Sequence, residues 1–360
     1  MMLRELAAQQ LLTERDVLRE MNADIAAGPA IYHPSPFWSK LGAWGRDQLD
    51  ANGFAYCKRT VGTRYFHWTT GGILAHQFWA VAWPWLCRPT AEVFRAWFPH
   101  PCVFPADGLR HFNTATATFY KTYVALLYDY VARRDPLRLL QRLEEPIAGT
   151  PFAIRYKGHW ISQDLCNSVH EFYSLGGEAL VRQDRPVHFL ELGAGYGRLG
   201  HVILEAIPQA TYTVVDIPPA LAVSQWYLPQ LFPSARCFRF RRMTSWAANQ
   251  DEFAAARIRF LSAPQLALLP DKSVECFINI STLHEMTPAQ IAHYFVQMDR
   301  VTWGEVYLKQ WRRSRVAKWN GCVITEDDYP IPLTWECVHY ANRHPIQRWF
   351  FEARYRVTDV

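Results

Sequence analysis

The chain has 360 residues, of which half are hydrophobic, a fifth are charged and 15% are aromatic. This composition can bury a sizeable core and excludes a mostly disordered chain, and the length fits one large or two ordinary domains. The net charge is +5, from 38 basic and 33 acidic residues, and the basic residues are scattered along the chain. Nucleic-acid-binding proteins cluster such residues, so we expect no nucleic-acid partner.

The cysteines and the apolar segments indicate the compartment. The eight cysteines have irregular spacings and form no CxxC pair, unlike a disulfide framework or a structural zinc site. Reduced thiols are typical of the cytoplasm, where we expect the protein. The first residues lack the continuous apolar stretch of a signal peptide. The most apolar window, residues 73–87, is shorter than the roughly 20 residues that a spanning helix needs, so we expect no membrane span.

The first 150 residues predict a mainly helical, aromatic-rich domain. Apolar residues recur at helical spacing in residues 3–26, and residues 114–134 form the clearest helical pattern that follows. Residues 54–68 carry β-favouring side chains around a glycine and predict a hairpin. We expect this domain to contact or cover an acceptor molecule, or to mediate homo-oligomerisation.

Strands and helices alternate from residue 151 to residue 360, which we assign to a second domain. A helix should begin after Ser162 and another after Thr287, each with its cap residue in place. The alternation predicts an α/β fold, with a Rossmann-like, doubly wound, mostly parallel seven-stranded sheet and an antiparallel carboxy-terminal hairpin. The expected strands are 187–192, 211–217, 257–263, 274–281, 305–311, 334–341 and 346–357.

The strongest functional signal is the segment VHFLELGAGYGRLG, in which Glu191 ends a strand and three glycines follow at alternate positions, Gly193, Gly195 and Gly197. Glycines allow the chain to turn sharply from strand to helix and let a ligand approach the backbone. Asp216 ends the next strand, where a carboxylate can accept hydrogen bonds from both hydroxyls of a ribose.

Three interpretations of this loop remain open. Residues 195–200 match the dinucleotide pattern GxGxxG, which would hold the pyrophosphate of NAD. That interpretation leaves Gly193 unexplained and places the Glu191 carboxylate beside an anion. A ligand with a cationic amino end and a ribose fits both acids better, and S-adenosylmethionine is such a ligand. A glycine turn without any ligand is the third interpretation.

Four segments resemble a known family. ELGAGYGRLG, VDIPPALAVSQWYL, FINISTLHEM and YLKQW, in this order, resemble the sugar O-methyltransferases, a branch of the class I S-adenosylmethionine-dependent methyltransferases. The resemblance covers roughly residues 150–345. The glycine motif is shared by many methyltransferases, whereas VDIPPAL and HEM carry the sugar assignment. The resemblance implies S-adenosylmethionine as cofactor and a small-molecule or glycan acceptor.

The resemblance and the strand layout also imply further contacts with the methyl donor. Adenine contacts should come from Ile217, which follows Asp216, and from Ser262 and Ala263 at the end of the third strand. Asn279, near the end of the fourth strand, should lie beside the donor.

Transfer of a methyl group to a hydroxyl needs a group that takes the hydroxyl proton. His284 and Glu285 follow the fourth strand, and histidine is the side chain that most readily exchanges a proton near neutral pH. Glu285 could orient His284, act as the base itself or bind sugar hydroxyls; a helix-capping role for Glu285 with a surface position for His284 is the alternative. Lys309 could bind an acidic group of the substrate, or be a solvated lysine. No spacing of acidic residues suggests a metal site.

We therefore predict an S-adenosylmethionine-dependent O-methyltransferase that methylates a hydroxyl of a sugar or sugar-containing acceptor by in-line displacement with general-base assistance. One alternative is an NAD(P)-dependent sugar oxidoreductase, in which the glycine loop would hold a pyrophosphate. The other is a non-catalytic, methyltransferase-like binding subunit.

Overall fold

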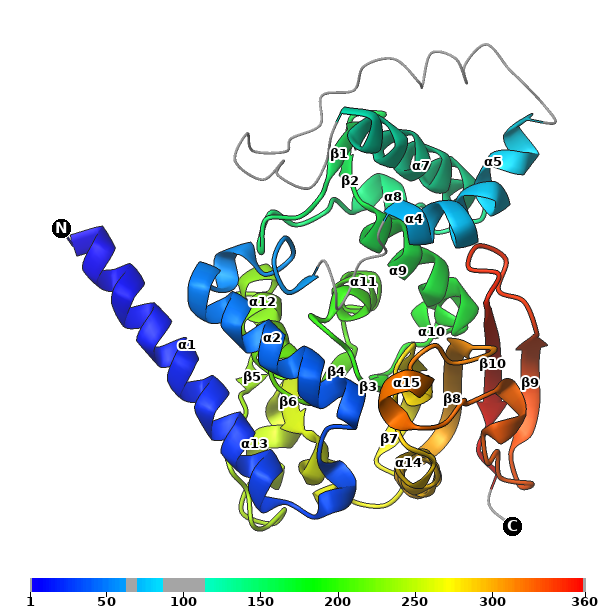
Figure 1. Cartoon of the computed structure of the whole chain (residues 1–360). Coiled ribbons are helices and arrows are strands. Elements are labelled where there is room, and N and C mark those ends of the chain that lie inside the picture. Colours follow the sequence, from blue (N-terminus) through cyan, green and yellow to red (C-terminus); the bar gives the residue numbers. More distant parts are fainter. Residues whose placement is uncertain (1, 63–69, 87–113, 359–360) are drawn as a thin grey trace.

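The computed structural model describes residues 2–62, 70–86 and 114–358 (Figure 1). Its amino-terminal part is helical, as the sequence predicts. The elements of this part are α1 (Met2–Ala27), η1 (Ala30–Tyr32), α2 (Pro36–Asn52), η2 (Phe54–Tyr56), α4 (Thr70–Ile73), a π-helical turn (Leu74–Phe78), α5 (Trp79–Leu86), α7 (Thr114–Ala132) and α8 (Leu139–Arg142).

The remaining residues form a mixed α/β unit. Its helices are α9 (Gln163–Ser174), α10 (Gly177–Val181), α11 (Arg198–Ala206), α12 (Ala220–Leu231), α13 (Gln250–Ala255), α14 (Pro288–Val301) and α15 (Ala317–Asn320). Its strands are β1 (Ile154–Tyr156), β2 (His159–Ile161), β3 (His188–Leu192), β4 (Thr211–Asp216), β5 (Cys237–Phe238), β6 (Ile258–Ser262), β7 (Val274–Ile280), β8 (Thr302–Trp311), β9 (Glu336–Ala341) and β10 (Phe350–Arg356). Short 3-10 helices lie at η5 (Ala263–Leu268), η6 (Leu283–Glu285) and η7 (Glu326–Asp328).

The central sheet has the strand order β5-β6-β4-β3-β7-β8-β10-β9. The pairs from β5 to β8 are parallel, whereas β10 runs antiparallel to both β8 and β9. The seven expected strands and the carboxy-terminal hairpin are thus confirmed. The two-residue strand β5 adds an eighth strand at one edge, which is too short to leave a pattern in the sequence.

Alternate residues of the strands pack into two separate apolar layers. On β3, Phe189 joins the layer formed by α9, α11 and α12, while Leu190 and Leu192 join the layer formed by η5 and α14. The side-chain period of two places neighbouring residues on opposite faces of a strand. Because helices cover both faces, the sheet is doubly wound, and the carboxyl ends of its parallel strands are the edge where ligands bind in such folds.

Both predicted helix caps are present. The Ser162 hydroxyl accepts a hydrogen bond from the Leu165 N–H at 3.0 Å at the start of α9. At the start of α14, the Thr287 hydroxyl accepts from the Gln290 N–H at 3.3 Å, and the Gln290 side chain reaches back to the Thr287 N–H at 3.1 Å. This reciprocal pair satisfies two backbone donors that a helix start leaves free, which explains where α14 begins.

The hairpin expected at residues 54–68 is wrong over residues 54–62, and its remainder lies outside the described residues. Residues 54–62 form η2 and turns. Phe54, Cys57 and Val61 are all buried, at helical rather than alternating spacing. The burial of these three side chains on one side outweighs their preference for strands.

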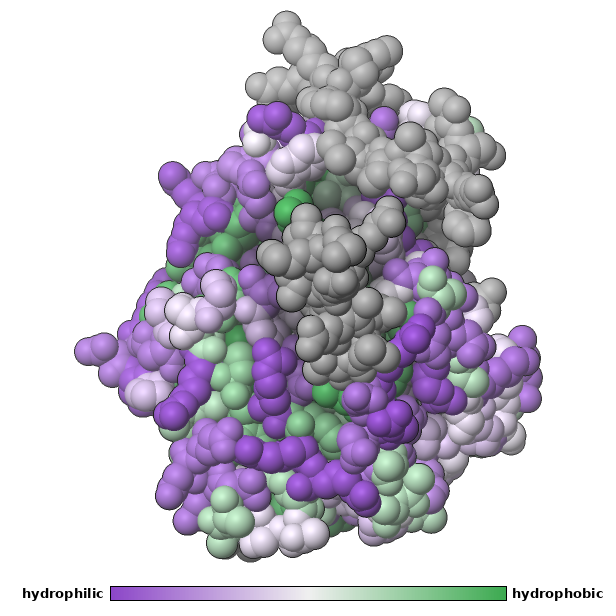
Figure 2. Space-filling model, turned by 90° about the vertical axis from the view of Figure 1, so that its left-hand side faces the viewer, coloured by the Kyte–Doolittle hydropathy of each residue, from purple (hydrophilic) through white to green (hydrophobic). Residues whose placement is uncertain are grey.

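Helix α1 lies along α12, β6 and η5 and is amphipathic. It buries Leu18, Met21 and Ile25 and exposes charged residues such as Arg15 and Glu20. On the side of the molecule that lies on the left of Figure 1, the surface drawn in colour in Figure 2 is mostly hydrophilic, with smaller hydrophobic areas between the polar ones. Residues before the expected boundary at 150 therefore pack directly on the α/β unit.

Candidate functional site

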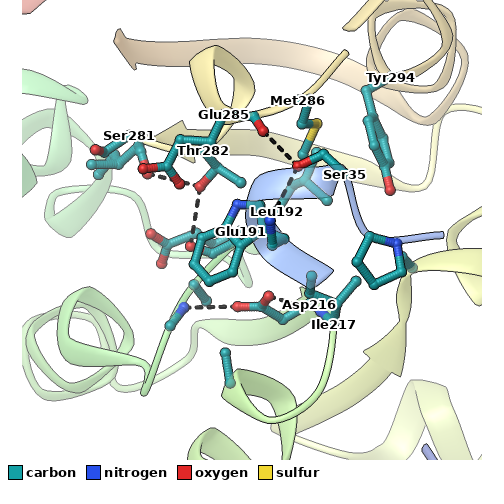
Figure 3. A pocket seen from close by; sticks show the side chains of 18 of the residues that line it. Ser35, Glu191, Leu192, Asp216, Ile217, Ser281, Thr282, Glu285, Met286 and Tyr294 are labelled. Atoms are coloured by element: carbon teal, nitrogen blue, oxygen red, sulfur yellow. Dashed lines mark hydrogen bonds between the residues drawn. The ribbon is translucent and has the colours of Figure 1, made fainter. Parts of the chain in front are cut away.

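A cavity of about 280 Å³ lies at the carboxyl ends of β3, β4, β6 and β7 (Figure 3). This is the position at which doubly wound sheets bind their ligands. Its wall combines the loops that follow these strands with a segment from the amino-terminal part and with aromatic residues at the ends of β8 and β10. The principal lining residues are Tyr32, Ser35, Trp38, Glu171, Glu191, Gly193, Gly195, Tyr196, Arg198, Asp216, Ile217, Ala263, Ser281, Thr282, Glu285, Trp311 and Phe350.

The loop after β3, residues 192–197, is here called the glycine loop. Gly193, Gly195 and Gly197 have φ angles of 77°, 61° and 86°, which are left-handed conformations that favour glycine. A Cβ atom at Gly193 would lie 2.2 Å from the Thr282 hydroxyl oxygen, in the cavity wall. The glycines thus bring the loop backbone closer to the opposite wall than any other residue would allow.

Two buried carboxylates flank this loop. Asp216 accepts hydrogen bonds from the N–H groups of Gly195 at 2.9 Å and Ile217 at 2.8 Å (Figure 3). Burial raises the pKa of Asp216 to about 7, although both N–H donors act in the opposite direction. Burial also raises the pKa of Glu191 to about 7, against the hydrogen bond that the Tyr212 hydroxyl donates to it. Both acids line the cavity, and burial makes the ionised form of each one costly. A cationic or hydroxyl-bearing ligand would reduce this cost.

A third carboxylate in the wall already has its partners. Glu171, on α9, is paired with the Arg198 guanidinium and with the Lys309 ammonium, the latter at 2.7 Å. Burial acts to raise the pKa of Glu171, but the two cations outweigh it and hold this pKa at about 2. Lys309 does not line the cavity: it is buried behind Glu171, where burial lowers its pKa more than Glu171 raises it. Lys309 therefore positions Glu171 in this structure.

The loop after β7 forms the wall opposite the glycine loop. Ser281 has a φ angle of 57°, a conformation that costs a residue with a side chain about 1–3 kcal/mol and that often occurs at functional sites. Glu285 lines the cavity, and its carboxylate lies 3.6 Å from His284 Nε2. His284 itself is buried behind this wall, with 2% of its surface exposed, so the alternative of a surface histidine does not apply.

Residues 32–38, here called the roof segment, form the part of the cavity wall that comes from the amino-terminal part of the chain. The Ser35 hydroxyl donates to the backbone carbonyl of Glu285 at 2.8 Å (Figure 3). The Gln290 amide nitrogen donates to the carbonyls of Ile31 at 3.1 Å and His33 at 2.7 Å. These bonds fix the amino-terminal part to the loop and helix that follow β7.

The structure brings together six of the nine residues predicted to contact the cofactor, namely Glu191, Gly193, Gly195, Asp216, Ile217 and Ala263. The other three lie outside the lining. Gly197 is the N-cap of α11, where a Cβ atom would contact Leu228 at 2.7 Å. Ser262 donates its hydroxyl hydrogen to Asp24 of α1, and Asn279 donates to the Leu192 carbonyl at 2.8 Å.

Sequence reasoning missed the roof segment, Glu171 and Trp311. The roof segment carries only the irregular pattern HPSP, which predicts a loop but not its partner. Glu171 lies on a predicted helix, and its burial depends on cations far away in the sequence, Arg198 and Lys309. Asp164, Ser168 and Glu171 lie on one face of α9, and all three are buried. The burial of this polar face indicates a functional site, but it cannot be recognised before the fold is known.

Within residues 2–62, 70–86 and 114–358, no group of three or more His, Cys, Asp or Glu side chains is arranged to hold a metal ion. None of the helices in these ranges has the length and apolar character that crossing a membrane requires.

Neither a protein-family model nor a curated protein matches the sequence. The structure is similar to the PH0226 protein from Pyrococcus horikoshii OT3, with a TM-score of 0.36 and 10% identity over 52% of this chain and 90% of that chain. It is similar to a SAM-dependent methyltransferase from Aquifex aeolicus, with a TM-score of 0.32 and 11% identity over 51% and 88% of the two chains. A third is the 1,6-didemethyltoxoflavin-N1-methyltransferase of Burkholderia thailandensis, bound to S-adenosylhomocysteine, with a TM-score of 0.33 and 14% identity over 65% and 88%.

Proposed function

We propose that the protein is an S-adenosylmethionine-dependent O-methyltransferase whose acceptor is a hydroxyl of a sugar or sugar-containing molecule. The observation that carries the proposal is the charge of the cavity. Four carboxylates line it, those of Glu171, Glu191, Asp216 and Glu285, whereas Arg198 is the one arginine or lysine among the described lining residues. Since Arg198 is paired with Glu171, the excess negative charge favours a cationic ligand over a pyrophosphate.

The walls of the cavity fit the parts of this donor. Asp216 is held by two backbone N–H groups, so its remaining lone pairs can accept hydrogen bonds from a ribose. One oxygen of Glu191 accepts from the Tyr212 hydroxyl, and the other has no hydrogen-bond partner among the described residues. This second oxygen can bind the cationic amino end of the donor. Gly193 and Gly195 line the cavity without side chains, so a ligand can approach the backbone of the loop. When bound, the donor supplies a methyl group activated by its positive sulfur.

The residues opposite the glycine loop fit an acceptor hydroxyl. Glu285 is placed to take the hydroxyl proton, because its carboxylate faces the cavity and His284 lies directly behind it. Trp38 and Trp311 add aromatic surface to the same wall, and the C–H faces of sugars pack well on such rings. The VDIPPAL and HEM segments, which resemble sugar O-methyltransferases, support the sugar rather than another hydroxyl compound.

Calorimetric titration distinguishes the proposed donor from a dinucleotide. We expect S-adenosylmethionine and S-adenosylhomocysteine to bind to the purified chain and NAD(H) and NADP(H) not to bind. Binding of a dinucleotide with no binding of the methyl donor would instead support the sugar oxidoreductase. The acceptor is then sought by mass spectrometry, as a gain of one methyl group on sugars, sugar nucleotides and glycosides incubated with the donor. Donor binding without methylation of any acceptor would favour a non-catalytic binding subunit.

A further inference from the structure

A row of buried amides runs behind the cavity, from the glycine loop to His284. Asn279 on β7 donates from Nδ2 to the Leu192 carbonyl at 2.8 Å. Gln310 on β8 donates from Nε2 to Asn279 Oδ1 at 2.5 Å and to the Asn279 main-chain carbonyl at 3.1 Å. Gln310 Oε1 lies 3.0 Å from His284 Nδ1. Both amide side chains are fully buried, so these contacts are not exchanged for water.

The direction of every hydrogen bond in this row follows from its first member. The Leu192 carbonyl can only accept, so Asn279 must turn its NH₂ group towards Leu192 and its oxygen towards Gln310. Gln310 then meets two acceptors on Asn279 and must turn its own NH₂ group towards them. The oxygen of Gln310 therefore faces the imidazole, because the neighbouring acceptors determine which end of the amide is the nitrogen and which is the oxygen.

The row fixes the position of the proton on His284. Because Gln310 Oε1 is an acceptor, His284 Nδ1 must carry a hydrogen, and in the neutral imidazole Nε2 is then the nitrogen with the lone pair. Nε2 lies 3.6 Å from Glu285 Oε1, which is also an acceptor when ionised. Two acceptors thus face each other and leave room for one proton between them.

We propose that Gln310 is a positioning residue that holds His284 as the Nδ1–H tautomer, so that Glu285 and His284 together accept one proton from the cavity. This inference rests on the proposed function for the origin of that proton. As the bond forms between the acceptor oxygen and the methyl carbon, the carbon–sulfur bond breaks and its electron pair stays on sulfur. The hydroxyl proton passes to the Glu285 carboxylate and from there to Nε2 of His284.

The surroundings of His284 support this role. The aromatic rings of Trp311 and Phe350 pack near the imidazole, with ring centroids 5.9 and 6.3 Å away. These rings keep water from the imidazole, so an added proton is stabilised chiefly by Glu285 on one side and Gln310 on the other. Glu285 lines the cavity, whereas His284 does not. A substrate proton therefore reaches His284 through Glu285.

The experiment is ¹⁵N NMR of the histidine side chains in the ligand-free full chain, at a pH where the imidazoles are neutral. The His284 signals are identified by their loss in His284→Gln. We expect the Nδ1–H tautomer for His284. His344 serves as an internal reference, because its Nδ1 accepts from the N–H groups of Ile346 and Gln347 at 3.2 and 2.9 Å and it must be the opposite tautomer. An Nε2–H tautomer at His284 in the unmodified protein would overturn the proposal without any variant.

The variant Gln310→Met keeps the length of the side chain and removes its hydrogen bonds. We expect His284 to lose the Nδ1–H preference in this variant and kcat to fall by about tenfold or more, within the range of general-base effects, with donor affinity unchanged. Thr302→Val is the matched control, since Thr302 is also buried on β8 and its hydroxyl has no partner among the described residues. An unchanged tautomer in Gln310→Met would contradict the inference. The tautomer is measured without donor or acceptor, so failure of the proposed function would appear separately, as absent donor binding.

Discussion

The two walls of the cavity are built in different ways. The wall around Glu191, Asp216 and the glycine loop comes from consecutive strand–loop units, β3 and β4 with their following turns. The opposite wall combines the roof segment, the loop after β7 and the ends of β8 and β10, which are as far apart in sequence as Ser35 and Phe350. The first wall is set by local backbone conformation and the second by tertiary contacts. Changes in the first should therefore affect donor binding, and changes in the second should affect turnover or acceptor binding.

The largest effect is expected from Gly193→Ala. The left-handed φ angle costs a residue with a Cβ atom about 1–2 kcal/mol, and the new methyl group would also collide with Thr282. We expect calorimetry to detect no donor binding, and thermal unfolding to show lower stability. Gly321→Ala is the control, because Gly321 has a similar φ of 74° and nothing within 4 Å of an added Cβ atom. Equal donor affinity in the two variants would show that the close approach at Gly193 is not needed.

Asp216→Ala removes the carboxylate assigned to the ribose. Hydrogen bonds to a charged group are worth about 1.5–3 kcal/mol, which corresponds to a loss of donor affinity of roughly 10–150-fold. Calorimetry measures this change directly. Ser35→Ala, in the other wall, is the comparison, and we expect it to keep the donor affinity. An unchanged affinity in a folded Asp216→Ala protein would remove the ribose assignment.

The pH dependence of donor affinity provides a smaller and separate test of the first wall. Glu191 and Asp216 both have pKa values near 7 in the free protein, so both lose charge as the pH falls through 7. We expect the affinity for the cationic donor to fall about tenfold between pH 8 and pH 6 for each carboxylate that the donor needs ionised. Glu171 stays ionised throughout this window, since its pKa is about 2.

The same two raised pKa values predict an effect on stability. A carboxylate with a raised folded-state pKa contributes stability at low pH that is lost as the pH rises from about 4 to about 7. Binding of a cation restores this stability, so the increase in Tm caused by the donor should be larger at pH 8 than at pH 6. An increase in Tm that is independent of pH would mean that neither carboxylate pairs with the ligand.

The smallest effect is expected from Ser35→Ala in the second wall. The variant loses the hydrogen bond to the Glu285 carbonyl and the cap at the start of α2, where the Ser35 hydroxyl accepts from the Trp38 N–H at 3.4 Å. A neutral hydrogen bond is worth about 0.5–1.5 kcal/mol, so we expect kcat/KM for the acceptor to fall a few-fold. Ser39→Ala is the control, because the exposed Ser39 hydroxyl donates within the roof segment, to the Pro34 carbonyl at 3.2 Å. Equal kinetics in both variants would show that the roof segment does not position Glu285.

The wall around the glycine loop could be predicted from the sequence better than the opposite wall. The glycine loop and Asp216 could be predicted because strand, turn and acid lie within 26 residues and follow local rules. The burial of His284 and the pairing of Lys309 with Glu171 could not, because each depends on a partner from another element. Residues 54–62 show the same limit, since β-favouring side chains there are packed as a helix-like turn. The role of residues 1–150 as a separate domain stays a prediction.

The Gln290 side chain links the two parts of the chain in a way that matters for engineering. Its oxygen completes the cap of α14, while its nitrogen holds the Ile31 and His33 carbonyls. A chimera that exchanges the first 38 residues with those of a relative would keep the fold of α14 but must present two backbone carbonyls at the same place. The side chains of this segment can therefore be exchanged, while its main-chain path has to be inherited unchanged.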